Sequence, residues 1–177
     1  MKILALLFSL LLAIPAYALT PAQMTTLQTN ILADHSFDSL PHNTDGAYAI
    51  AVAYNLPASS TFIVWKTSVD PAEIMAGGMD WTRVDNLTVG KSRIWDWMTR
   101  LNSFDASKAN VRAGIDAVWV GTAADLAERA DVYTHCKRQA TRLEKLFATG
   151  TGTDASPATM VIEGQVTYQD VATTMGW

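Results

Sequence analysis

The chain has 177 residues, of which 49% are hydrophobic and 17% charged, and its formal net charge at pH 7 is −4. This length suffices for one domain with a hydrophobic core, and the mild acidity gives no overall attraction for nucleic acid or an anionic membrane. Cys136 is the only cysteine, which excludes an intrachain disulfide and a metal site built from cysteines.

The first eighteen residues, MKILALLFSLLLAIPAYA, follow the pattern of a secretory signal peptide. Lys2 is followed by an apolar run over 3–14 and by Ala16-Tyr17-Ala18, an A-x-A cleavage site. The run is shorter than the roughly 20 residues that a membrane span needs. The alternative is a start codon assigned too far upstream, so that these residues are never made. The first interpretation predicts export, with no membrane attachment after cleavage.

The next segment carries a clear helix start. Thr20 can act as the N-cap, Pro21 suits the first helical position, and Gln23 can reach back as in a capping box. Apolar residues then recur at helical spacing and predict a helix over 21–33. They are Met24, Leu27, Ile31 and Leu32.

Two further segments precede the centre of the chain. Residues 46–55 (GAYAIAVAYN) favour a helix, with a strand as the alternative because Ile50 and Val52 alternate with alanines. Residues 61–67 (TFIVWKT) are β-branched and aromatic, which predicts a strand or extended segment.

A short capped helix is expected after this strand. Asp70 is a capping acid, Pro71 suits the first position, and Gly77-Gly78 ends the helix. Residues 81–84 then read as a short extended segment.

The densest packing signal lies between Leu87 and Gly121, where two amphipathic helices joined by a tight turn are expected. Their apolar stripes predict an αα-hairpin that serves as the scaffold of the core. The first stripe holds Ile94, Met98 and Leu101 with Trp95 beside them, and the second holds Val111, Ile115, Val118 and Trp119.

Thr122 can cap a long helix over 123–149, on which apolar residues recur in a nearly heptad pattern. This stripe includes Cys136, so we expect a buried thiol there, with His135 on the solvent side. The stripe consists of Leu126, Ala130, Tyr133, Cys136, Ala140, Leu143 and Phe147.

The C-terminal part is expected to hold three short segments. Residues 149–157 have the composition of a flexible loop, 158–163 read as a strand, and 168–175 form a last helix capped by Thr167. The whole pattern predicts a mainly α protein, a single compact helical domain over residues 19–177. We expect about five to six helices and one or two short strands or extended segments.

No residue cluster specifies a reaction, so we expect a non-enzymatic protein without catalytic, cofactor-binding or metal-binding residues. Gly90-Lys91-Ser92 lacks the earlier glycine of a phosphate loop, because Asp85 stands there. It reads instead as a helix start capped by Thr88. Asp34-His35-Ser36 holds the residue types of a hydrolytic triad, but a triad is assembled from distant segments.

Four residues are candidates for protein contact: Trp97, Arg138, Arg142 and Lys145. Trp97 falls about 200° around its helix from Trp95. It therefore either packs on another element of the chain, which is favoured, or forms an exposed anchor for a partner. The three basic residues, with Lys137, lie near the end of the long helix, where the helix dipole favours positive charge. An acidic partner is the alternative, and the lack of interleaved aromatic residues argues against nucleic acid.

Several ordered segments resemble a family of small uncharacterised proteins encoded by tailed bacteriophages and prophages. The resemblance covers most of residues 19–174. The segments are Val64–Val69 (VWKTSV), Glu73-Ile74, Leu87–Trp95 (LTVGKSRIW), Lys108–Ile115 (KANVRAGI), Ala140–Thr153 (ATRLEKLFATGTGT) and Tyr168–Val171 (YQDV). The resemblance implies a gene of the virion structural region, and hence a part or helper of the virion, head–tail junction or tail.

This resemblance implies contacts with other phage structural proteins and permits a homo-oligomer, and it carries no catalytic or binding residues. Members of the family begin near the equivalent of Leu19, and virion parts assemble in the host cytoplasm. A virion or cytoplasmic location therefore requires that residues 1–18 be a wrongly assigned start. If the signal peptide is real, the alternative is an exported periplasmic helical protein of unknown function.

Overall fold

The computed structural model describes residues 19–177, so the expected signal peptide at 1–18 lies outside the described residues. Contacts divide the chain into two compact units, where the sequence predicts one domain. Unit 1 comprises the residues up to Ala53 together with Gly164–Trp177, and unit 2 comprises Tyr54–Glu163. The predicted mainly α class is confirmed, since helices dominate and a single two-stranded sheet accompanies them in the described chain.

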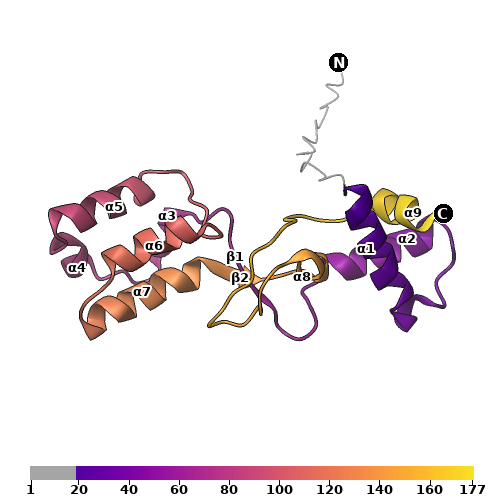
Figure 1. Ribbon diagram of the computed structural model, residues 1–177, viewed down its shortest axis with the longest axis horizontal. Coiled ribbons are helices and arrows are strands. Elements are labelled where there is room, and N and C mark those ends of the chain that lie inside the picture. Colours follow the sequence, from indigo (N-terminus) through magenta and orange to yellow (C-terminus); the bar gives the residue numbers. More distant parts are fainter. Residues whose placement is uncertain (1–18) are drawn as a thin grey trace, which may run out of the picture. The chain divides into compact units, whose positions relative to one another are not determined.

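Unit 1 is built from helices α1 (Pro21–Leu32), α2 (Thr44–Asn55) and α9 (Tyr168–Met175), with a short 3₁₀ turn at His35–Phe37 (Figure 1). All three helices contribute buried apolar side chains, and α1 packs against α9. Those buried side chains include Leu27, Ile31, Ile50 and Val171.

The predicted helix starts in this unit are confirmed. The Thr20 hydroxyl accepts from the Gln23 amide at 3.3 Å, and the Thr20 amide donates to Gln23 Oε1 at 2.8 Å, which completes a capping box. Thr167 and Asp170 form the same reciprocal pair at the start of α9. The choice between helix and strand at 46–55 is settled in favour of the helix α2.

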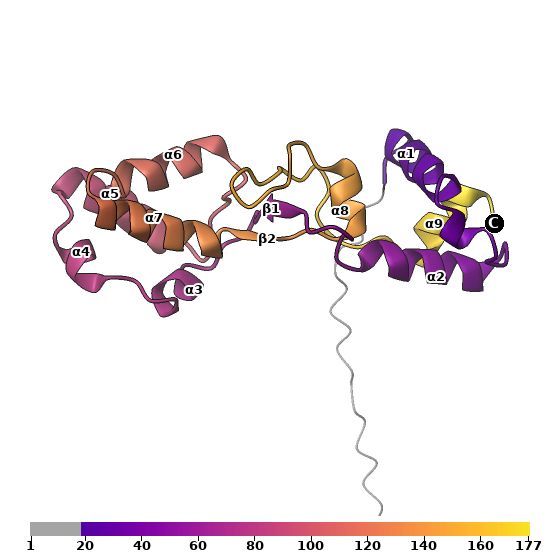
Figure 2. The same cartoon turned by 90° about the horizontal axis from the view of Figure 1, so that it is seen from below.

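Unit 2 contains the sheet and six helices. Strand β1 (Ile63–Trp65) pairs antiparallel with β2 (Lys137–Gln139), and Val64 stands opposite Arg138. The two strands lie side by side in both views (Figures 1 and 2). The helices are α3 (Pro71–Ala76), α4 (Trp81–Asp85), α5 (Val89–Thr99), α6 (Ala109–Val118), α7 (Ala123–His135) and α8 (Arg142–Phe147).

The main core of unit 2 lies among the helices from α3 to α7. Its buried members include Ile74, Trp95, Trp119 and Val132, and half-buried Ile94, Met98 and Val111 pack against them. A smaller core around Val64 and Ala158 lies at the sheet. The predicted α3, with the Asp70 carboxylate accepting from the Ala72 amide and Gly77 as its C-cap, is confirmed.

The expected long helix over 123–149 is wrong. The chain leaves the helix after His135 because residues 137–139 pair with β1, and the Ala140 amide donates to the Phe62 carbonyl at 2.8 Å. A second helix, α8, then starts with a Thr141–Glu144 capping box. Of the expected stripe, Cys136, Ala140 and Leu143 are buried, whereas Leu126 and Ala130 are exposed.

Residues 81–84 are helical rather than extended. The Asp80 carboxylate caps α4 by accepting from the Thr82 and Arg83 amides, and Trp81 is 57% exposed. The described chain has nine α-helices, more than the expected five to six. Helix α4 and the division of the long helix into α7 and α8 account for two of the additional helices.

Two connections also differ from expectation. The α5–α6 hairpin is present, but residues 100–108 join it instead of a tight turn, and Leu101 is exposed. Within this connection Phe104 exchanges backbone hydrogen bonds with Val69. The expected strand at 158–163 is reduced to isolated bridges at Ala158 and Thr159.

None of the described helices has the length and apolar content to cross a membrane.

Candidate protein-contact surface

Helix α5 presents the candidate surface, and its start lies where the sequence predicts it. Thr88 has the extended backbone of an N-cap, although its side chain makes no capping hydrogen bond. Lys91 follows in the first turn, and its ammonium donates to the Val120 carbonyl at 3.0 Å. The Gly90-Lys91-Ser92 sequence therefore lies in the first turn of a helix, where Lys91 ties α5 to the residue that follows Trp119.

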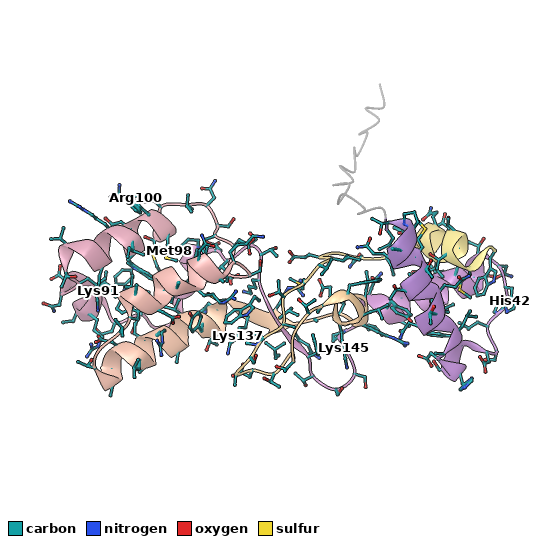
Figure 3. The ribbon with its side chains drawn as sticks, in the orientation of Figure 1. His42, Lys91, Met98, Arg100, Lys137 and Lys145 are labelled. Atoms are coloured by element: carbon teal, nitrogen blue, oxygen red, sulfur yellow. The ribbon has the colours of Figure 1, made fainter. Side chains whose placement is uncertain are left out.

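One side of α5 is fixed by core packing. Trp95 is buried, and its ring meets that of Trp119 edge to face. Met98 lies on the side of α5 that faces α6 (Figure 3), near Gly114 of that helix. An aromatic pair of this geometry stabilises a core by about 0.5–1.5 kcal/mol beyond the area that it buries. The rotation of α5 about its axis is therefore set by Trp95.

The opposite side of α5 is exposed, and Trp97 is its largest member with 69% of its surface accessible. The favoured expectation that Trp97 packs within the chain is wrong, because helical geometry turns it away from the buried Trp95. We use the term α5 face for the exposed residues Val89, Arg93, Trp97 and Leu101. They follow one another at intervals of four residues, which aligns them along the helix and its C-terminal end.

The charges beside Trp97 are partly unpaired. Arg100 pairs with Asp96 at 3.4 Å, and Figure 3 shows Arg100 on the side of α5 away from α6. The Arg93 side chain is exposed and makes no hydrogen bond or ion pair with any described residue. The α5 face thus combines an exposed indole with a guanidinium one turn earlier.

Arg138, the second candidate, is engaged inside unit 2. Its guanidinium donates to both carboxylate oxygens of Glu144 at 2.7 Å each and to Glu163 at 3.0 Å. Glu144 is only 2% exposed. These hydrogen bonds hold the pKa of Arg138 above its ordinary range. A bidentate pair on a buried carboxylate is a structural contact, so Arg138 joins β2 to α8.

Arg142 and Lys145 are also used within unit 2. The Arg142 guanidinium lies 4.3 Å from the ring centroid of Tyr54. The Lys145 ammonium donates to the Ser59 carbonyl at 3.2 Å and lies 5.6 Å from the Phe62 ring centroid. These residues therefore do not lie with Arg138 at the end of one helix. Because the expected helix over 123–149 is absent, its dipole does not account for their positive charge.

Two hollows in unit 2 were not foreseen from the sequence. One, of about 320 Å³, is lined by residues of α4, α5 and α7, and its Arg83 pairs with Asp125 at 2.6 Å. The other, of about 350 Å³, is lined by Trp65, Tyr133 and Lys137 among others, and Lys137 pairs with Asp154 at 2.8 Å. Arg83 and Lys137 are thus each paired with an acid of the same lining, whereas Lys91 of the first hollow donates to the Val120 carbonyl.

A buried acid on α7 was also missed. Glu128 is 7% exposed, and one of its oxygens accepts from the Asp80 amide at 3.4 Å. Its other oxygen and Asp131 Oδ2 are buried without a partner among the described residues. Burial raises the pKa of Glu128, and the neighbouring Asp131 charge adds to this effect. No sequence signal separated Glu128 from the solvated acids of the same helix.

The remaining chemical candidates have structural roles. Cys136 is buried as expected, and burial raises the pKa of its thiol to about 12. His135 is half-buried against Gly77 rather than on the solvent side. The Asp34 carboxylate accepts from the Ser36 amide, and His35 pairs with Asp38. In residues 19–177, no group of three histidine, cysteine or acidic residues has an arrangement that could hold a metal ion.

No known protein family, curated protein or solved structure matches this chain. Among the four predicted contact residues, Trp97 is the exposed aromatic side chain.

Proposed function

We propose that this chain is a non-enzymatic virion or morphogenesis protein of a tailed phage or prophage, from the tail or head–tail region. It acts by contacts with phage structural proteins, and the α5 face is its surface for protein contact. Two lines of support are independent of each other: the ordered segments that resemble a phage family, and the exposure of Trp97.

The observation that carries the proposal is the contrast between Trp95 and Trp97. Trp95 is 4% exposed and fixes the helix, so Trp97 is held at 69% exposure on a rigid element. An indole offers roughly 150–250 Å² of surface for burial, with few rotatable bonds to immobilise. Tryptophan and arginine are the residue types most enriched at the energetic centres of interfaces, and Arg93 lies one turn from Trp97.

The segments that carry the resemblance include the scaffold of this face. Residues 87–95 contain the start of α5 with Val89 and Arg93, and residues 108–115 contain most of α6, which packs against α5. A family resemblance that includes this hairpin is consistent with a shared use of its exposed side.

Mass spectrometry of purified particles tests the proposal. Particles produced by the genome that encodes the chain should contain it at a reproducible ratio to the major capsid protein, or its deletion should stop particle assembly at a defined stage. Absence of the chain from particles, together with normal assembly and infectivity after deletion, would refute the proposed function.

The alternative proposal, an exported periplasmic helical protein, is favoured by one specific observation, the signal-peptide pattern of residues 1–18. N-terminal sequencing of the protein made in its host, combined with fractionation, separates the two. A product that begins at Leu19 and is found in the periplasm supports export. A cytoplasmic product removes the only support for export, whichever residue it begins with.

A further inference from the structure

The α5 faces of two copies are complementary when their α5 helices lie antiparallel. Arg93, the unpaired cation, and Trp97, the exposed aromatic ring, are four residues apart and lie on the same side of the helix. If a second α5 lies antiparallel to the first, with a two-fold axis level with position 95, Arg93 of each copy faces the partner's Trp97. The same axis therefore creates two identical cation–aromatic pairs.

The charges next to this pair also match in the antiparallel arrangement. Arg93 comes level with the partner's Trp97 and lies within one residue of the partner's Asp96. That Asp96 already pairs with Arg100 of its own chain at 3.4 Å, so Arg93 joins an exposed ion pair and shares its carboxylate. The positive end of each helix dipole also lies beside the negative end of the other. A parallel arrangement would instead place Arg93 beside the partner's Arg93.

The two ends of the face are complementary in size. Gly90 has open space above its Cα, since a Cβ built there would meet no atom within 4 Å. The antiparallel axis brings Val89 and Gly90 opposite the partner's Arg100 and the partner's Leu101. The small residue leaves room for the two long side chains, and the exposed Val89 gives them an apolar surface to cover.

We propose that two copies of this chain associate through their α5 faces, as an antiparallel two-fold pair centred between Arg93 and Trp97. The inference rests on the proposed function only in assigning this face to protein contact, and it names a second copy as the occupant. Helix α5 spans about 16 Å, so the interface is small, and the association is weak and dependent on concentration.

Sedimentation velocity of the purified protein at concentrations up to about 1 mM tests this pair. The wild-type protein should shift from monomer to dimer across this range. Trp97→Arg sets arginine against arginine at both pairs and should raise the dimer Kd by about 30-fold or more. The double variant R93W/W97R exchanges the two side chains and should restore association to within about threefold of wild type.

A control variant and a folding assay accompany the sedimentation measurements. Trp81→Ala removes another exposed tryptophan, outside α5, and should leave the dimer Kd unchanged. Circular dichroism should show every variant folded, because Arg93 and Trp97 are exposed. A wild-type monomer over the whole range, a Trp97→Arg variant that dimerises like wild type, or a folded double variant that stays monomeric would each overturn the pair.

The failure of the pair and the failure of the proposed function are distinguishable. A monomeric protein that is nevertheless found in particles overturns the second copy as occupant and leaves the phage role standing. A dimer in solution that is absent from particles, with normal assembly after deletion, supports the pair and refutes the phage role.

Discussion

Trp95 and Trp119 meet edge to face in the core of unit 2, with ring centroids 5.2 Å apart and planes inclined by 78°. Both side chains are buried, whereas Trp97, two residues after Trp95, is mostly exposed. One helix thus carries one tryptophan that stabilises the fold and another that does not contribute to the core.

We expect Trp95→Ala to lower the free energy of unfolding by about 3–5 kcal/mol, because it removes the edge-to-face contact and leaves a large cavity. Trp97→Ala should change it by about 0.5 kcal/mol or less, as is usual for surface substitutions. Chemical denaturation followed by circular dichroism measures both. Equal destabilisation by the two variants would show that Trp97 also packs in the fold.

The bidentate pair of Arg138 with buried Glu144 predicts a large effect from a residue expected on the surface. Arg138→Ala leaves the Glu144 carboxylate buried without its counter-ion and should cost about 3–5 kcal/mol. Lys108→Ala, which breaks an exposed pair with Asp105 at 3.7 Å, is the control and should cost less than about 1 kcal/mol. A loss below about 1 kcal/mol for Arg138→Ala would mean that the pair is not formed in solution.

Glu128 predicts a stability that falls as the pH rises. Its raised pKa means that the folded state binds the proton more tightly than the unfolded state, so stability is lost from about pH 4.3 upward through the folded pKa. Glu128→Gln should therefore be more stable than wild type at pH 7, and the difference should shrink toward pH 4.

The contribution of Asp125 to stability depends on pH in the opposite sense to that of Glu128, so Asp125 serves as the control. The Thr122 amide lowers the pKa of Asp125, so its contribution is present at neutral pH and is lost as the pH falls. Asp125→Asn should be less stable than wild type at pH 7, with a smaller difference at low pH. Thermal melts of both variants between pH 4 and 8 measure these trends, and parallel pH profiles would contradict the assignment.

Cys136 should resist thiol reagents in the folded protein, because it is buried and its pKa is raised to about 12. Labelling with a maleimide should proceed only after addition of denaturant. Ser103→Cys, placed in the exposed connection after α5, should be labelled at once and provides the positive control. Rapid labelling of native wild-type protein would mean that the segment from α7 to β2 opens readily.

The helix starts could be predicted because their signals are local. Thr20 with Gln23 and Thr167 with Asp170 satisfy each other's hydrogen bonds within one turn. At α3 the Asp70 carboxylate accepts from the Ala72 amide, and Pro71 occupies the first helical position. Asp80 gives the same local signal before α4, although residues 81–84 were expected to be extended. Local capping was the stronger influence there.

The break after α7 could not be predicted from local sequence. Residues 137–139 (KRQ) have no strand pattern, and they become β2 because Ile63–Trp65 pair with them from more than seventy positions away. Glu163 pairs with Arg138 across another 25 positions, so this ion pair could not be predicted from local sequence either. The orientation of Trp97, by contrast, follows from helical periodicity relative to Trp95 once α5 exists.

The central claim is that the α5 face acts in protein contact within a phage particle. Quantitative mass spectrometry of particles from phage that carry Trp97→Ala, compared with Trp81→Ala, tests it most directly. We predict that Trp97→Ala strongly reduces the copies per particle or the yield of complete particles, while Trp81→Ala leaves both at wild-type values. Equal incorporation and yield for the two folded variants would contradict the claim.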